Sequence, residues 1–146
     1  MKISEEQYQR FQNAINKYKG LSPQMYGNKK ALKYHNNKVQ YNGIIFDSIK
    51  EKNRYLWLKV LEEEGKISEL ELQKKFKLQE SFINNEGKKE RPIYYICDFF
   101  YYSNDLNCYI AEDVKSEITR QDKVYRLKKK MFEYQYPNVV FKEVLW

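Results

Sequence analysis

Residues 91–115, RPIYYICDFFYYSNDLNCYIAEDVK, decide the fold of this chain. Two runs rich in aromatic and branched side chains flank the polar segment SNDLN, residues 103–107. Near-continuous apolar runs are typical of strands buried on both faces, and a short polar turn between them predicts an antiparallel hairpin. We therefore expect the two runs to pair with each other and to form the middle of a sheet.

Three charged residues interrupt the apolar runs of this hairpin: Asp98 in the first, and Asp113 and Lys115 in the second. A four-residue turn at Ser103–Leu106 would place Asp113 diagonally next to Asp98 on the same face of the hairpin. Lys115 would share that face because strand side chains alternate with period two. This register predicts one pocket that holds two acids and an amine.

Such a pocket suits phosphodiester hydrolysis, because carboxylates on rigid neighbouring strands hold Mg²⁺ well. Lys115 beside the metal could orient or deprotonate the attacking water, or hold a phosphate oxygen. A one-residue slip in the turn would instead bring Glu112 beside Asp98, whereas the favoured register turns Glu112 to the opposite side. The same residues would also suit a buried ion pair, and spacing alone does not separate the two interpretations.

The chain before the hairpin predicts an N-terminal helical extension, a linker, a small hairpin, a helix and a strand. The small hairpin turns at Asn42-Gly43, and the helix that follows ends at Gly65. The strand pattern has one irregularity near Ser68. The expected bounds are a helix at 4–18, a basic linker at 21–37, strands within Lys38–Phe46, a helix from Ser48 to about Glu64, a strand from Ile67, and a loop at 84–92.

After the hairpin, a helix is expected from about Gln121 to Tyr136, because Val124, Leu127, Met131 and Tyr134 recur at three- and four-residue steps and Pro137 ends the pattern. A last strand covers Asn138–Val144. The order α, β, β, β, α, β predicts an α/β or α+β fold in which helices flank a mixed sheet.

The charge of the chain favours a polyanionic partner. Lys and Arg number 27 against 20 Asp and Glu, so the net charge is +7 and the isoelectric point is about 9.2. We expect DNA as the partner, no membrane helix, and a cytoplasmic protein, in the bacterial host if it is phage-encoded. Cys97 and Cys108 lack the spacing of a zinc site or a disulfide scaffold, and we expect both to be reduced packing residues.

Several phrases of the sequence, with Asp98, Asp113-Val114-Lys115 and this element order, resemble the PD-(D/E)XK nuclease superfamily. The phrases are KYHNNKV, GIIFDSIKEKNRY, LELQKKFKLQ, YICDFFYY, IAEDVK and VYRLKKKMFEYQYP, and they look like a phage and prophage family of unknown function within that superfamily. Relatives by layout include Holliday-junction resolvases, mismatch-nicking repair endonucleases and transposon-end endonucleases. The resemblance covers about Lys33 to Val144.

The resemblance implies a restriction-endonuclease-like core and a Mg²⁺- or Mn²⁺-dependent DNA endonuclease, with 1–20 as an extension, 21–37 as a linker and 38–146 as the nuclease domain. Asp98 and Asp113 match the metal-binding acids, Lys115 matches the catalytic lysine, and Glu51 matches the acid of the first helix. Cys97 departs from the pattern, which has proline there. A branched or replicating DNA substrate and a homodimer follow by analogy. The alternative is a nuclease-fold protein without turnover that binds DNA or host machinery.

Other candidate residues have competing interpretations. Ser48 and Glu51 also form a capping-box pattern, so Glu51 could serve the helix start alone. Gln73 is a minor candidate for the site, and the spacing of Gln121 and Tyr125 is short enough to occur by chance. The residues expected to contact DNA are Lys33, His35, Lys38, Arg126, Lys128 and Lys129.

Overall fold

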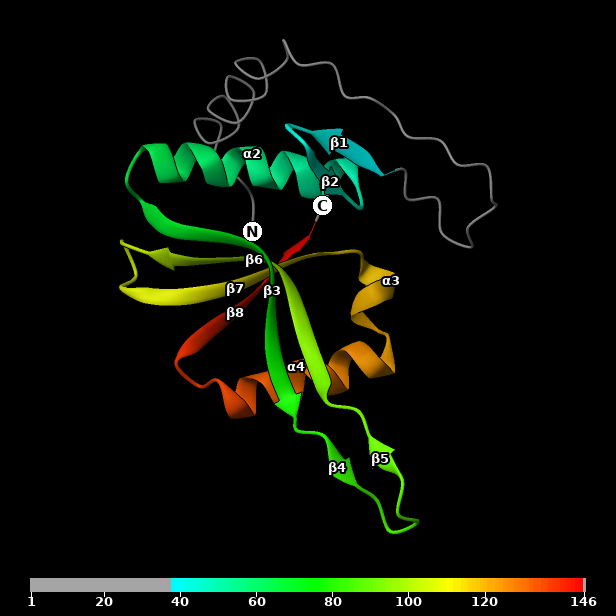
Figure 1. The fold of residues 1–146 in the computed structure, drawn as a ribbon. Coiled ribbons are helices and arrows are strands. Elements are labelled where there is room, and N and C mark those ends of the chain that lie inside the picture. Colours follow the sequence, from blue (N-terminus) through cyan, green and yellow to red (C-terminus); the bar gives the residue numbers. More distant parts are fainter. Residues whose placement is uncertain (1–37, 146) are drawn as a thin grey trace. The chain divides into compact units, whose positions relative to one another are not determined.

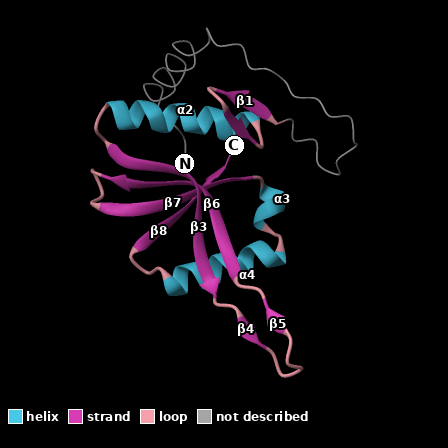
Figure 2. Cartoon of the chain, viewed as in Figure 1, coloured by secondary structure: helices cyan, strands magenta, loops and turns pink. Residues whose placement is uncertain are grey.

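The computed structural model describes residues 38–145, which fall into two units on either side of the boundary between Glu64 and Gly65. The predicted N-terminal helix and basic linker lie outside the described residues. Three helices and a four-stranded mixed sheet make the described chain an α+β protein, as Figure 1 and Figure 2 show. In this part of the chain no helix has the length and apolar character required to span a membrane.

The first unit contains the predicted small hairpin and helix. Strands β1 (Val39–Tyr41) and β2 (Ile44–Phe46) pair antiparallel around Asn42 and Gly43. Both turn residues have positive φ, 47° and 77°, as the tight turn of an Asn-Gly hairpin requires. The sequence signal for this hairpin is therefore confirmed.

Helix α2 (Ile49–Glu63) begins where the sequence predicts. The Ser48 side chain accepts a hydrogen bond from the backbone N–H of Glu51 and caps the helix. Gly65, with φ of 70°, takes up the left-handed conformation that commonly follows a helix end. Local sequence thus determines both ends of this helix.

The second unit is built on a four-stranded sheet with the order β3-β6-β7-β8. The pairs β3–β6 and β6–β7 are antiparallel, and β7–β8 is parallel, so the sheet is mixed. The predicted hairpin supplies the two central strands β6 and β7, as expected. The bounds are β3 Ile67–Gln79, β6 Ile93–Ser103, β7 Cys108–Lys115 and β8 Val139–Leu145.

Strand β3 carries the irregularity that the sequence indicated. Its register with β6 shifts between Ser68 and Glu71, and Glu69 has φ of 57°. The prediction of a loop at 84–92 is wrong in part. Strands β4 (Phe82–Ile83) and β5 (Lys89–Glu90) form a small antiparallel hairpin there. The hairpin lacks an alternating apolar pattern, which explains why the sequence did not reveal it.

Between β7 and β8, the predicted helix is confirmed as α4 (Lys123–Gln135), and a short helix that was not predicted, α3 (Glu117–Arg120), precedes it. The Asp122 side chain caps α4 by accepting from the N–H of Tyr125. Helix α4 lies along one face of the sheet (Figure 1). The break between α3 and α4 therefore falls where Asp122 starts a new helix instead of continuing the old one.

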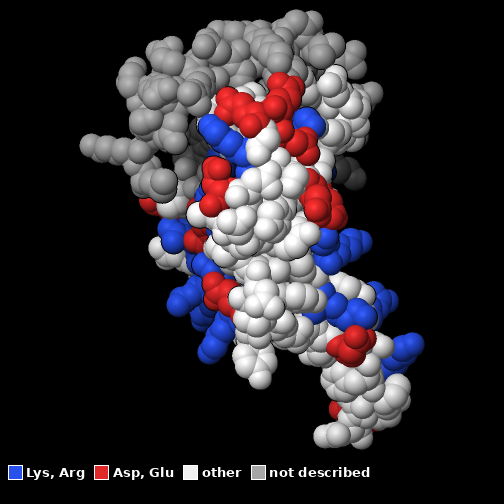
Figure 3. Space-filling view, turned by 90° about the vertical axis from the view of Figure 1, so that its left-hand side faces the viewer, with Lys and Arg blue, Asp and Glu red and all other residues white. Residues whose placement is uncertain are grey.

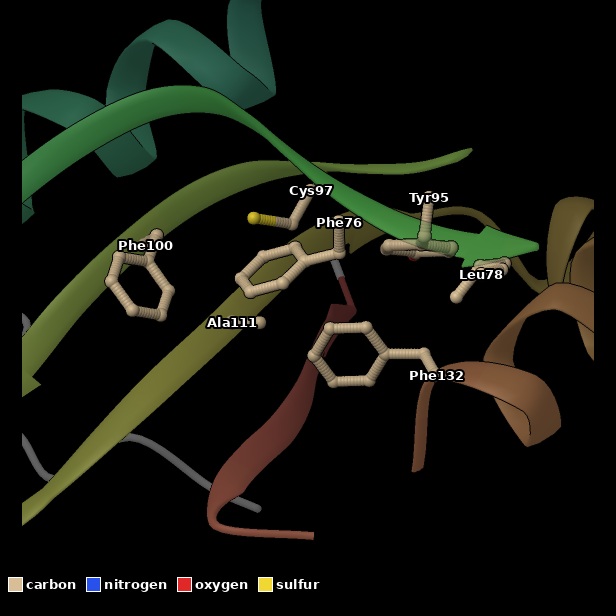
Figure 4. Close-up of a cluster of buried hydrophobic side chains, with 7 residues drawn as sticks. All are labelled: Phe76, Leu78, Tyr95, Cys97, Phe100, Ala111 and Phe132. Atoms are coloured by element: carbon tan, nitrogen blue, oxygen red, sulfur yellow. The ribbon is translucent and has the colours of Figure 1, made fainter. Parts of the chain in front are cut away.

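Phe132 of α4 is completely buried, whereas Val124, Leu127 and Tyr134 of the apolar residues at helical spacing are exposed and Met131 packs against the core. Phe132 enters a cluster of aromatic and aliphatic side chains on the sheet, drawn in Figure 4. Its ring makes edge or tilted contacts with four neighbouring rings. The cluster consists of Phe76, Leu78, Tyr95, Cys97, Phe100, Ala111 and Phe132.

Candidate active site

The candidate site lies where the ladder between β6 and β7 ends. The last paired residues are Phe99 and Glu112, and continuing the register places Asp98 directly opposite Asp113. Beyond this pair, hydrogen bonds to the two aspartate side chains take the place of main-chain hydrogen bonds between the strands. The N–H of Asp98 donates to Asp113 Oδ1 at 2.9 Å, and the N–H of Val114 donates to Asp98 Oδ2 at 2.8 Å. Both carboxyl groups are thus fixed by the backbone of the opposite strand.

The predicted turn was wrong by one residue on each strand. The ladder starts at Ser103 and Cys108, so the turn comprises 104–107 rather than Ser103–Leu106. Asp113 is therefore directly opposite Asp98 rather than diagonal to it. The change in register amounts to two residues, and a shift of two preserves the face on which each side chain lies. The predicted grouping of Asp98, Asp113 and Lys115 on one face is confirmed for that reason.

Asp113 is the most enclosed of the three predicted residues. Its side chain has no exposed surface, and its Oδ2 atom accepts no hydrogen bond from the described residues. The Lys115 Nζ atom lies 3.4 Å from this oxygen. Burial raises the pKa of the Asp113 carboxyl, although Lys115 and the N–H of Asp98 oppose the shift. The site therefore contains a buried carboxyl oxygen with capacity for another electropositive partner.

Lys115 is supported from α4 by Tyr125. The Lys115 ammonium lies 5.4 Å from the centre of the Tyr125 ring, within the range of a cation–π contact. The Tyr125 hydroxyl donates to Glu143 Oε1 at 2.7 Å, and burial together with this bond raises the pKa of the Tyr125 phenol. Tyr125 is therefore a neighbour of the site, whereas no hydrogen bond joins Gln121 to the site's residues in the described part of the chain.

Glu143 was missed by the sequence analysis. It lies on β8 in register with Asp113, and it also accepts from Arg120 Nε at 2.7 Å and Lys129 Nζ at 3.0 Å. Burial alone would raise its pKa, but its donors, Tyr125 and Lys129 foremost, outweigh burial and lower it. No motif identifies Glu143, since its partners are brought to it only by the packing of α3 and α4.

Gln73 approaches the site from β3. Its neighbours Leu72 and Lys74 pair with Phe99 and Cys97, so Gln73 is opposite Asp98. Its φ of 53° interrupts the ladder, and its Nε2 atom lies 3.4 Å from Asp98 Oδ1. The minor candidate of the sequence analysis is therefore a neighbour of the first acid.

Glu112 lies on the other side of the sheet, as predicted. It is completely buried, and its Oε2 atom accepts from the Tyr101 hydroxyl at 2.7 Å and lies 3.5 Å from Lys142 Nζ. A buried carboxylate with its own donors needs no role in the site.

Glu51 belongs to the first unit, where the capping box is observed. Its N–H donates to Ser48 Oγ at 3.1 Å, and its Oε2 atom accepts from the N–H of Asp47 at 3.0 Å. The capping interpretation is therefore confirmed, and the role of Glu51 as a metal ligand stays a prediction.

The predicted DNA contacts differ in their surroundings. Lys33 and His35 lie outside the described residues, and Lys38 forms an exposed ion pair with Asp47 at 3.3 Å. Arg126 is exposed on α4 and Lys128 is half-buried. Lys129 is paired with Glu143, so its charge is already partly compensated within the fold.

The described residues contain no cluster of three or more His, Cys, Asp or Glu side chains that could hold a metal ion. The carboxylate oxygens that could act as metal ligands at the site are those of Asp98 and Asp113. Cys97 and Cys108 are both free thiols, and burial raises the pKa of the Cys97 thiol to about 12. Cys97 packs in the core cluster, as the sequence analysis predicted.

Comparisons with known proteins identify one family. No curated protein and no solved structure matches the chain. A family model described as "Protein of unknown function (DUF1064)" matches residues 31–145, which include every strand and helix described above. The chain therefore belongs to the DUF1064 family of proteins of unknown function.

Proposed function

We propose that this protein is a metal-dependent endodeoxyribonuclease that hydrolyses phosphodiester bonds. The observation that carries the proposal is the buried Asp113 carboxyl group, with an oxygen that accepts no hydrogen bond, opposite Asp98 and 3.4 Å from the Lys115 amine. A buried carboxyl with a raised pKa beside another acid and an amine is characteristic of functional sites. A buried polar atom without a hydrogen bond is uncommon in folded proteins and supports a functional role.

The donor set fits Mg²⁺ or Mn²⁺. These ions prefer carboxylate oxygens, and Mg²⁺ usually keeps several water molecules and is bound by only one or two protein carboxylates. Asp98 and Asp113 would hold the ion, and Asp113 Oδ2, which has the Lys115 ammonium at 3.4 Å but accepts no hydrogen bond, has room for a second positive partner. A bound ion would neutralise the charge that develops on the transferring phosphoryl group. Glu51 remains a proposed additional ligand.

The protein's own residues have separate roles in this proposal. Asp98 and Asp113 are held by backbone N–H groups, so their carboxyl groups are preorganised. Lys115, whose side chain is 19% exposed, can reach a phosphate oxygen or an attacking water molecule from beside Asp113. Tyr125 of α4 lies beside the Lys115 ammonium, and Glu143 of β8 holds Tyr125 in place by accepting a hydrogen bond from its hydroxyl.

The charge distribution supports DNA as the substrate. Residues 1–37, which include Lys33 and His35, contain seven Lys and Arg but only two Asp and Glu, so they carry most of the excess positive charge. On the face drawn in Figure 3, lysine and arginine side chains, with acidic side chains among them, border a band of uncharged surface. Arg126 is exposed on α4 and directly follows Tyr125, a neighbour of the site, in the sequence, so its side chain is available to bind a phosphate group. These features favour salt-dependent binding to a polyanion.

The resemblance to the PD-(D/E)XK superfamily, and to a phage and prophage family of unknown function within it, supports three further parts of the proposal: a restriction-endonuclease-like core, an origin in a phage, and a branched or replicating DNA substrate. Cutting both strands of a junction symmetrically would require two sites, so a homodimer belongs to the same proposal.

A second candidate is a DNA-binding or host-interaction protein of this fold without turnover. It is favoured by the bonds that Asp98 and Asp113 already make, because each replaces a main-chain bond at the end of the β6–β7 ladder. On this view, the two acids terminate the hairpin and need no metal.

The deciding experiment offers the purified protein supercoiled, linear and four-way-junction DNA with Mg²⁺, with Mn²⁺ or with a chelator. We expect metal-dependent cleavage that falls at least about a hundredfold in Asp113→Asn, the range seen when a key electrostatic group is removed. Asp105→Asn is the matched control, because Asp105 is exposed in the turn of the same hairpin. A gel-mobility shift without cleavage, for every DNA substrate and with either metal, would support the second candidate instead.

A further inference from the structure

Helix α4 carries a second apolar stripe, and of its four members only Met131 packs against the core cluster. Its members are Val124, Leu127, Met131 and Tyr134, called here the outer stripe. Val124, Leu127 and Tyr134 are 61%, 59% and 86% exposed, and Met131 is half-buried. The helix is anchored to the sheet by a different residue, Phe132, which is completely buried. Three of the four members of the outer stripe are therefore exposed although the helix itself is firmly packed.

Single exposed apolar residues are common and need no explanation. The outer stripe differs because its members are separated by three, four and three residues, which is the spacing of the a and d positions of a heptad. Side chains at this spacing lie along one side of a helix and form a seam that suits the side chains of a second helix. The pattern therefore indicates a partner helix rather than scattered surface residues.

The borders of the outer stripe are positively charged. In heptad terms, Lys123 and Lys130 occupy g positions and Lys128 occupies an e position. Among the described residues, none forms an ion pair with these three lysines, whereas the adjacent Lys129 is paired with Glu143. The residues bordering a helix seam select its partner by charge, so three uncompensated lysines favour acidic residues on the opposite helix.

We propose that the outer stripe of α4 docks an amphipathic helix of a partner protein, with apolar residues at heptad spacing and acidic residues on both sides. A second copy of this chain is disfavoured, because α4 packed on itself would bring lysines against lysines. Single-stranded DNA is disfavoured because base stacking requires aromatic side chains, and Tyr134 is the one aromatic member of the stripe. This interaction does not depend on the proposed nuclease activity.

The test uses the full chain and two lactam-stapled helical peptides, each fluorescently labelled. Both peptides carry leucine at the a and d positions, and they differ only in having glutamate or lysine at e and g. We expect the glutamate peptide to bind at least about tenfold more tightly, measured by fluorescence anisotropy at low salt. Leu127→Gln should abolish binding, whereas Ile96→Gln should not, since Ile96 is an exposed apolar residue on β6.

A charge-reversed variant makes the test independent of folding defects. Lys123→Glu combined with Lys130→Glu should bind the lysine peptide and reject the glutamate peptide, which a misfolded protein could not do. Equal affinity for both peptides, or no binding of either, would overturn the proposal. A homodimer that Leu127→Gln dissociates would assign the stripe to a second copy. Leu127-dependent binding of oligo-dT or of phosphatidylserine vesicles, in place of the glutamate peptide, would assign it to nucleic acid or to a membrane surface.

Discussion

Replacing Phe132 by alanine tests which side of α4 supports the fold. The side chain is completely buried, and its ring centre lies 4.9 Å from that of Phe76, 5.3 Å from Tyr136, 5.4 Å from Phe141 and 5.6 Å from Tyr95. Truncating a buried phenylalanine to alanine costs about 3 to 5 kcal/mol of unfolding free energy. Aromatic pairs add about 0.5 to 1.5 kcal/mol each beyond buried area. We therefore expect Phe132→Ala to lower the unfolding free energy by about 5 kcal/mol, near the upper end of the range for a buried phenylalanine.

Leu127→Ala is the matched comparison on the same helix. Leu127 is 59% exposed, so its truncation removes little buried surface, and leucine and alanine have similar helix propensities. A surface substitution of this kind changes the unfolding free energy by no more than about 0.5 kcal/mol.

Urea unfolding, followed by far-UV circular dichroism, would measure the unfolding free energy of both variants. The values are comparable if the slope of the free energy against urea concentration is the same as in the wild type. A loss below about 1 kcal/mol for Phe132→Ala would refute the packing described here, since it falls outside the range for buried aromatic residues. A loss above about 2 kcal/mol for Leu127→Ala would equally contradict it, because exposed positions do not show such costs.

Three further changes probe the acidic residues. Burial raises the pKa of the Asp113 carboxyl above its ordinary 3.8, so the folded chain binds the carboxyl proton more tightly than the unfolded chain does. The wild-type protein should therefore lose stability relative to Asp113→Asn as the pH rises from 3.8 through the raised pKa. The measurement is made in chelating buffer. A constant difference between the two unfolding free energies would contradict this. Tyr101→Phe removes the phenol donor of buried Glu112 and should cost about 1 to 3 kcal/mol in urea unfolding, part of which Glu112→Gln in the same chain should restore. Glu51→Gln keeps an oxygen for the Asp47 N–H, so stability should change by less than about 1 kcal/mol. Metal-dependent cleavage should fall in that variant, and unchanged cleavage would limit Glu51 to capping.

The grouping of Asp98, Asp113 and Lys115 was predictable because it depends on a local property, the alternation of side chains along a strand. An error of one residue on each strand in the turn left the face unchanged, since the resulting shift in register was two. The caps at Ser48 and Gly65 were predictable for the same reason. These features depend on residues that are neighbours in sequence or along one strand.

The support of the site was not predictable in this way. Tyr125 and Glu143 are 18 residues apart and come from a helix and a strand that meet only in the folded chain. Gln73 reaches Asp98 because β3 pairs with β6 across a long connection. Contacts between distant segments have no periodic trace in the sequence, so Glu143 in particular carried no signal.

Helix α4 shows most clearly what the tertiary structure decided. Its sequence contains two sets of apolar residues at helical spacing, one around Phe132 and one formed by Val124, Leu127, Met131 and Tyr134. Periodicity predicts an amphipathic helix but cannot choose between two such faces. The aromatic cluster on the sheet makes the choice, because Phe132 fills it and is completely buried there. The sequence by itself thus determined the elements, their order and the common face of the acids, whereas the complementary shapes of helix and sheet decided which residues became core and which remained free for a partner.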